Sequence, residues 1–105
     1  MSSKLEAPIS RAISSQISSD LDGMGPTARS ILKIVLLHGG DMDHADIVKN
    51  LRNQGASDTD IMEGFGQCRN SMLIWDKLPT PFNQHHTWNV SPTVQRDLVS
   101  MLDRL

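Results

Sequence analysis

Residues with side chains that can bind metal ions gather near the middle of the sequence, at His38, Asp41, Asp43 and His44, and the pair His85–His86 follows farther along. Imidazole and carboxylate groups are accepted ligands of zinc. None of these residues, however, stands at a recognised zinc spacing with a cysteine. Helix capping and a solvated loop are the simpler explanation for this stretch. We therefore predict no metal site and no cofactor.

Residues that could carry out catalysis are not arranged in a recognised pattern. The chain has no glycine-rich phosphate loop, no nucleophile and base at a recognised spacing, and no suitable carboxylate pair. The single cysteine, Cys68, falls on an apolar stripe and is expected to be a small core residue in a reducing compartment. No apolar run is long enough to span a bilayer, and no secretory signal is recognisable. We expect a cytoplasmic protein that is not an enzyme.

The overall charge does not by itself favour binding to nucleic acids. The chain has 10 Lys and Arg against 12 Asp and Glu, a net charge of −2, whereas small nucleic-acid-binding domains are usually basic. Phosphates are contacted by one face of a protein, so the charge of that face, and not the net charge, decides whether the chain can bind nucleic acid. The length of 105 residues and the apolar content of 38% predict one domain with a single modest core.

Apolar spacing predicts two helices in the first part of the chain. One follows Pro8 within an N-terminal arm over residues 1–26, and its apolar face is made by Ile9, Ala12, Ile13, Ile17 and Leu21. The main domain covers residues 27–105. It opens with a central core helix that Thr27 caps and Gly39–Gly40 ends.

Two further helices are separated by a sharp turn. They are predicted over Asp43–Gln54 and Asp58–Ser71, with Gly55–Ala56–Ser57 as the turn. Ser57 and Asp60 form a capping-box pattern at the start of the second helix. Its inward stripe is Ile61, Phe65, Cys68 and Met72, and its outward set is Thr59, Asp60, Glu63, Gln67 and Asn70.

The remaining residues predict a hairpin and a closing helix. A strand over Met72–Trp75 and a returning strand over Gln84–Val90 flank a loop that two prolines interrupt. Trp75 and Trp88 fall one on each strand, where packing against the core is the expected role and a ligand pocket is the alternative. Ser91–Pro92 starts the last helix, whose apolar face is Val94, Leu98, Met101, Leu102 and Leu105.

The order of these elements is that of a winged helix-turn-helix, and the chain resembles MarR- and PadR-type regulators. Three stretches carry the resemblance: Asp46–Val48 with Leu51 and Gly55–Ser57, then Asn70–Trp75, and then His86–Pro92 with Arg96 and Leu98. It covers roughly residues 27–105 as a pattern of apolar positions and turns. The resemblance implies a mainly α fold with a small β hairpin (α+β), a winged helix-turn-helix with an added N-terminal helix and a C-terminal helix.

The resemblance also implies sequence-specific binding to double-stranded DNA by a two-fold dimer, with the second helix of the motif in the major groove. The residues expected to face the groove are Ser57, Thr59, Asp60, Glu63, Gln67 and Asn70. Phosphate contacts are expected from Lys49, Arg52, Arg69 and Lys77. Gln84, His85 and His86 are expected near the wing.

The second helix departs from this resemblance in its charge. It begins with Asp58, Asp60 and Glu63 and has no basic residue before Arg69. Base-reading helices commonly use Arg or Lys to contact guanine. Acidic residues do stabilise a helix N-terminus, by ~0.3–1 kcal/mol each. The acidic helix leaves open a protein-interaction adaptor without direct DNA contact.

Two glycines inside the same helix are also unusual. Gly64 and Gly66 each cost about 1 kcal/mol relative to Ala in a helix interior. The sequence leaves two explanations open. Either the helix is weak there, or a neighbouring segment approaches it closely.

The first and last helices both carry long apolar faces, and a domain of this size is not expected to bury both against its own core. We therefore predict a homodimer with an interface made by Ile9, Ile13, Ile17, Leu21, Val94, Leu98, Met101, Leu102 and Leu105. The expected function is transcription regulation as a repressor. The alternatives are the adaptor, with a protein partner, and DNA binding in plasmid or phage segregation.

Overall fold

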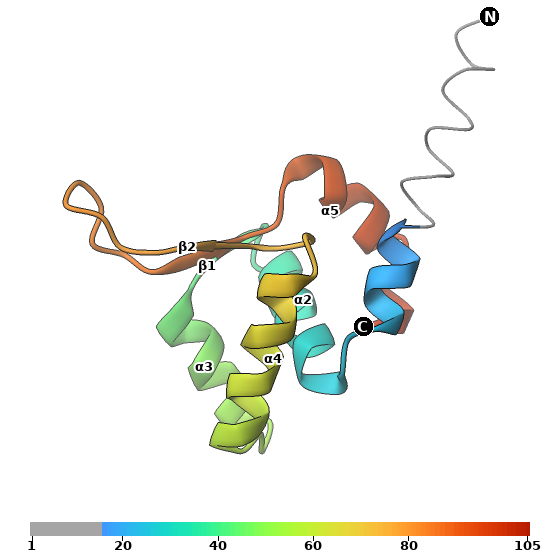
Figure 1. Cartoon of the computed structure of the whole chain (residues 1–105), viewed down its shortest axis with the longest axis horizontal. Helices are drawn as coiled ribbons and strands as arrows, with labels where there is room; N and C mark the ends of the chain where they lie inside the picture. Colours follow the sequence, from blue (N-terminus) through green and yellow to red (C-terminus); the bar gives the residue numbers. More distant parts are fainter. Residues whose placement is uncertain (1–15) are drawn as a thin grey trace, which may run out of the picture.

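The computed structural model describes residues 16–105, which fold mainly into helices with one small antiparallel sheet (Figure 1). In chain order the elements are a helical segment over residues 16–22, α2 (Pro26–Leu37), β1 (Asp41–Asp43), α3 (His44–Asn53), α4 (Asp58–Asn70), β2 (Trp75–Lys77), β3 (Thr87–Asn89), α5 (Pro92–Val99) and the 3₁₀ turn η1 (Leu102–Arg104). The expected α+β class is confirmed. In the described part of the chain, no helix is both long and apolar enough to cross a membrane.

The helix α2 lies at the centre of the core. Its inward side chains, which are fully buried, are Ala28, Ile31, Leu32 and Val35. Gly25, and not Thr27, occupies the N-cap position. The reason is Pro26, whose fixed φ and missing N–H suit the first helical position. As expected, the helix ends before Gly39 and Gly40, whose φ angles of +88° and +91° favour glycine.

The helix α4 packs directly against α2, as the buried contacts between them show. A Cβ atom at Gly64 would lie 2.8 Å from Cγ2 of Thr27 and 3.1 Å from Cδ1 of Ile31. The Sγ atom of Cys68 donates a hydrogen bond to the backbone oxygen of Ala28 at 3.6 Å. Close approach of a neighbour therefore explains Gly64. Cys68 is a buried core residue, as expected. Its burial raises the pKa of the thiol to about 12.

The sheet has three strands in the order β1-β3-β2, and not only the two of the expected hairpin. The additional strand, β1, comes from Asp41–Asp43, which the sequence predicts as a lead-in to a helix. Met42 is its one buried residue, and it pairs with buried Trp88 of β3. Asp76 of β2 pairs with Trp88 on the other side. A strand this short has too few residues for alternation to be recognised.

The first hairpin strand lies farther along the chain than predicted. It covers Trp75–Lys77 and not Met72–Trp75, and the returning strand is limited to Thr87–Asn89. The hydroxyl of Ser71 donates to the backbone oxygen of Cys68 at 2.8 Å and accepts from the N–H of Leu73 at 3.2 Å. These local bonds end α4, because they replace the next helical hydrogen bonds. Met72 then has a φ of +62° and is 75% exposed, so it does not belong to the inward stripe.

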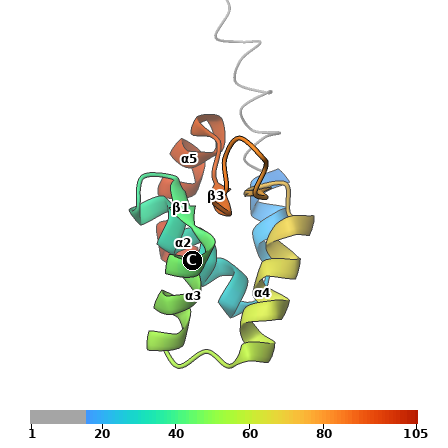
Figure 2. The same ribbon diagram turned by 90° about the vertical axis from the view of Figure 1, so that its left-hand side faces the viewer.

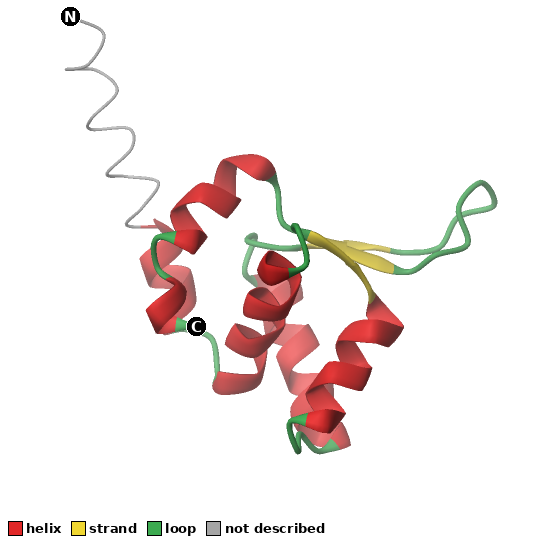
Figure 3. Ribbon diagram, turned by 180° about the vertical axis from the view of Figure 1, so that it is seen from behind, coloured by secondary structure: helices red, strands yellow, loops and turns green. Residues whose placement is uncertain are grey.

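The described parts of both terminal apolar faces pack against the core of their own chain, so their apolar character does not by itself require a dimer. The segment 16–22 lies beside α5 (Figures 1 and 3). Ile17, Leu21 and Leu98 are buried in the common core, and the residues packed more loosely against it include Val94, Met101 and Leu105. Leu102 is half-buried. The guanidinium of Arg104 in η1 donates hydrogen bonds to Ser18 and Asp22 of the segment 16–22. Ile9 and Ile13 lie outside the described residues.

Candidate functional site

The helices α3 and α4 are joined at one end by a short turn (Figure 2), and α2 packs against both of them. Gly55 in this turn has a φ of +90°, and Ala56 N–H donates back to the oxygen of Leu51 at 3.0 Å. The expected capping box is present. Ser57 Oγ accepts from Asp60 N–H at 3.1 Å, and Asp60 Oδ2 accepts from Ser57 N–H at 3.1 Å. The bond from the Ser57 backbone lowers the pKa of Asp60.

The acidic residues at the start of α4 have partners within the chain. Asp60 serves in the capping box, and Asp58 Oδ1 lies 3.3 Å from the guanidinium Nη2 of Arg52 on α3. Both side chains of this ion pair are mostly exposed, so its contribution to stability is small. Glu63 is left as the acidic residue of α4 with neither an ion pair nor a capping bond among the described residues.

The outer face of α4 lies opposite its buried residues, which are Ile61, Gly64, Phe65 and Cys68. Helical spacing places Thr59, Glu63, Gly66 and Asn70 on this face. Gln67 was expected there too, but its Oε1 accepts a hydrogen bond from the N–H of Gly25 at 2.7 Å. Gln67 is therefore engaged at the start of α2, and its expected groove contact stays a prediction.

Gly66 has no packing reason comparable to that of Gly64. No described atom lies within 4 Å of where its Cβ would be. A glycine in the interior of a helix costs about 1 kcal/mol relative to Ala. Gly66 thus lowers the stability of α4, and no packing contact among the described residues explains its presence. Residues that disfavour the local secondary structure in this way are expected mainly at functional or strained sites.

The base of the hairpin is held by a carboxylate that binds two basic side chains. Asp76 Oδ2 accepts from Nε of Arg69 at 2.8 Å, and Asp76 Oδ1 lies 2.6 Å from Nε2 of His86. Burial by itself would raise the pKa of Asp76, but the bonds from Arg69 and His86 outweigh it and lower that pKa. Arg69 also lies over the ring of Trp88, 5.5 Å from its centroid. Arg69 and His86, both of which were expected to contact DNA, are engaged by Asp76 at this base.

His44 also contacts the residues at the base of the hairpin, which the sequence does not predict. His44 is in the first turn of α3, as expected, and its Nδ1 accepts the indole N–H of Trp88 at 3.1 Å. Its ring packs on Phe65 with centroids 4.5 Å apart. Burial, and then the neighbouring His86, lower the pKa of His44. Because 44 residues separate His44 from Trp88, no local signal could have predicted the contact.

The two tryptophans of the hairpin have different environments. Trp88 is buried and packs between hairpin and core, as expected. Trp75 is exposed, which corrects the expectation that both tryptophans pack against the core. It pairs with Asn89 on the face of the sheet away from Met42 and Trp88. The two rings therefore do not bound a common pocket.

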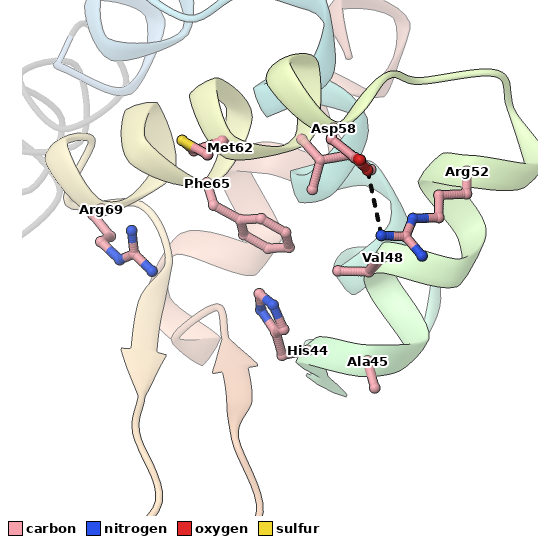
Figure 4. Close-up of a pocket in the computed structure, with 9 residues that line it drawn as sticks. His44, Ala45, Val48, Arg52, Asp58, Met62, Phe65 and Arg69 are labelled. Carbon is pink, nitrogen blue, oxygen red and sulfur yellow. Dashed lines mark hydrogen bonds and ion pairs between the residues drawn. The ribbon is translucent and has the colours of Figure 1, made fainter.

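A groove of about 660 Å³ lies between α3 and α4 (Figure 4). Its apolar wall includes Val48, Ile61 and Phe65, and Met62 is 75% exposed at its rim. The Arg52–Asp58 ion pair bridges one end. His44 and Arg69 line the groove at the hairpin end.

The remaining predicted contact residues are distributed over two surfaces. Lys49 is exposed on α3, and Lys77, Gln84 and His85 are exposed on the hairpin. Within residues 16–105, no three His, Cys, Asp or Glu side chains are arranged to hold a metal ion. Comparisons with protein-family models, with curated proteins and with solved structures gave no match.

Proposed function

We propose that this chain is a small DNA-binding transcriptional regulator of the winged-helix type, with α4 as the recognition helix and the loop between β2 and β3 as the wing. The order of the elements supports this assignment. A short strand precedes two helices joined by a tight turn, and a hairpin follows. The first strand pairs with the last, which ties the helix pair to the base of the hairpin.

The observation that carries the proposal is the outer face of α4. Thr59 and Asn70 offer hydrogen-bonding groups suited to base edges. Gly66 between them allows a partner surface to approach the helix backbone. Of the acidic residues at the start of α4, Asp58 pairs with Arg52 and Asp60 caps the helix, which leaves Glu63 as the one without an assigned partner among the described residues. A carboxylate at Glu63 can accept a hydrogen bond from the amino group of cytosine.

Phosphate contacts are assigned to the exposed lysines on either side of α4. Lys49 lies on α3 and Lys77 on β2, and neither has an ion pair among the described residues. Arg52 is not counted among these contacts, because its guanidinium pairs with Asp58.

The experiment that tests the proposal is fluorescence anisotropy with random-sequence duplex DNA at low and moderate salt. We compare the wild type with the double variant Lys49→Ala, Lys77→Ala. The expected result is weaker binding and a salt slope smaller by about two, one unit for each lost phosphate contact. Site selection then follows with the wild type.

The matched control is the double variant Lys33→Ala, Arg96→Ala, which removes the same charge from exposed positions on α2 and α5. It should bind as the wild type does. Equal losses in both double variants would reduce the effect to net charge and contradict the assigned surface. Absence of wild-type binding at low salt would overturn the proposal.

The groove between α3 and α4 favours one other function, that of a winged-helix adaptor that binds a protein. Its apolar wall and the exposed Met62 suit an apolar side chain of a partner. If the chain is such an adaptor, Met62→Ala should abolish binding of the partner protein. The same variant should not change any binding of DNA that the wild type shows. The charge substitutions at Lys49 and Lys77 would have no comparable effect.

A further inference from the structure

The loop between β2 and β3 carries a fully exposed aromatic side chain. Phe82 is 100% exposed, and Leu78 in the same loop is mostly exposed. The loop extends away from the helices (Figures 1 and 3). An exposed phenyl ring forgoes the stabilisation that burial of its apolar surface would give. Phe82 does not contribute to the core of this chain.

The loop is shaped so that Phe82 stands at its tip. Thr80 N–H donates to the oxygen of Asn83 at 2.7 Å, and Asn83 N–H donates back to Thr80 O at 3.2 Å and Thr80 Oγ1 at 3.0 Å. Asn83 Oδ1 then accepts from the N–H of His85 at 3.1 Å. Pro81 occupies the turn position where its fixed φ is most suitable. These bonds close the turn and keep the ring of Phe82 in solvent.

The charge around this tip suits a polyanion. The sequence from Lys77 to Arg96 contains no Asp or Glu, although the whole chain has a net charge of −2. Lys77 and His85 are exposed on the loop or its strand. A nucleic acid can use both features, because its stacked bases accept the exposed ring of Phe82 and its phosphates favour the acid-free surround.

We propose that the loop enters the minor groove of DNA and that Phe82 inserts as a wedge between adjacent base pairs and bends the duplex. The inference rests on the proposed function and specifies how the hairpin takes part in it. Apolar side chains inserted from the minor groove unstack base steps and kink DNA toward the major groove. Pyrimidine–purine steps such as TA unstack most easily, so the wedge favours them. The bend brings more of the protein surface against the phosphates.

The test uses two duplexes of equal length, one rich in TA steps with 2-aminopurine at a central step, and one made only of G·C pairs. Dyes at the two ends report bending by energy transfer. Wild-type protein should bind the TA-rich duplex more tightly, raise the 2-aminopurine fluorescence and shorten the distance between the ends. Phe82→Ala should bind this duplex roughly tenfold more weakly, without either signal.

Two further variants serve as controls. Phe82→Trp keeps a flat apolar ring and should restore both signals. Leu37→Ala removes an exposed apolar side chain at the end of α2, outside the loop between β2 and β3, and should behave as the wild type. Because both positions are exposed, none of these variants is expected to alter the fold.

The outcomes separate this inference from the function on which it rests. Wild-type binding without unstacking and bending would overturn the wedge and leave the regulator proposal standing. The same holds if Phe82→Ala bends the duplex as the wild type does, or if Phe82 proves to be needed only for a protein partner. A wild type that binds neither duplex would overturn both proposals at once.

Discussion

The imidazole rings of His44 and His86 lie parallel, with centroids 4.4 Å apart and an angle of 4° between their planes. His44 belongs to α3 and His86 leads into β3, so the stack connects the helix pair to the base of the hairpin. The backbone strengthens this connection, because His44 N–H donates to the oxygen of His86 at 2.8 Å. The charge state of His44 therefore bears directly on how the hairpin is held.

The first prediction concerns pH. The charged groups facing His44 are His86, Asp76 and Arg69, and burial with His86 lowers its pKa below the ordinary value of 6.5. The folded chain then binds fewer protons than the unfolded chain in the range below pH 6.5. The free energy of unfolding should fall as pH falls from 7 through the folded-state pKa of His44. Chemical denaturation at several pH values measures this dependence.

The variant His44→Gln should reduce this pH dependence, because its side chain does not titrate. Loss of the ring should also cost about 1 kcal/mol at neutral pH, from the hydrogen bond with Trp88. His85→Gln, at an exposed position of the hairpin, should keep the wild-type profile. If His44→Gln loses stability toward acid as steeply as the wild type, the assignment to His44 is wrong.

The second prediction compares the two glycines of α4. Gly66→Ala should stabilise the protein by up to about 1 kcal/mol, since Ala favours the helix and no described atom obstructs its Cβ. Gly64→Ala should destabilise it, because the stiff, β-branched side chain of Thr27 leaves no room. Thermal denaturation measures both. If α4 enters a DNA groove, Gly66→Ala should also bind DNA more weakly despite its greater stability.

A third prediction follows from the carboxylate of Asp76, whose side chain is only 15% exposed. Asp76→Asn should cost about 1–3 kcal/mol of stability, because two charge-assisted hydrogen bonds are weakened. It should also increase affinity for random duplex DNA, since Arg69 is no longer neutralised. Asp97→Asn is the charge-matched control on α5. A variant with unchanged stability would contradict the role of Asp76 at the hairpin base.

The fourth prediction concerns the terminal helices. Leu98 is fully buried within its own chain, so Leu98→Ala should cost about 2–5 kcal/mol in stability. The loss should not depend on protein concentration, which it would if Leu98 lay between two subunits. Denaturation curves at several concentrations give the answer. A midpoint that rises with concentration in the wild type and not in the variant would show that Leu98 lies at a dimer interface.

Local patterns predicted much of the helix pair. The capping box of Ser57 and Asp60, the turn at Gly55 and the core position of Cys68 all depend on residues within one or two helical turns. Such features follow from hydrogen bonding and spacing along the chain. The end of α4 was less predictable, because the apolar spacing continues to Met72 whereas the hydroxyl of Ser71 ends the helix.

The partners of the site residues were not predictable from the sequence. From the sequence alone, a basic side chain such as Arg69 is interpreted as a phosphate contact. The structure shows that Asp76 lies beside it and binds it. An apolar face such as that of Ile17 and Leu98 shows that burial is needed, but not which surface covers it. Only the tertiary structure tells whether such a face is covered by its own chain or by a second copy of the chain.

The contact of Arg104 with the segment 16–22 has a consequence for synthesis of the chain. Its guanidinium binds Ser18 Oγ at 2.7 Å and Asp22 Oδ1 at 2.6 Å. Ile17 and Leu21 are translated before α5 and η1, which lie beside their segment in the folded chain. The nascent chain therefore exposes an apolar surface until residues near Arg104 emerge, and folding is completed after most of the chain has been translated.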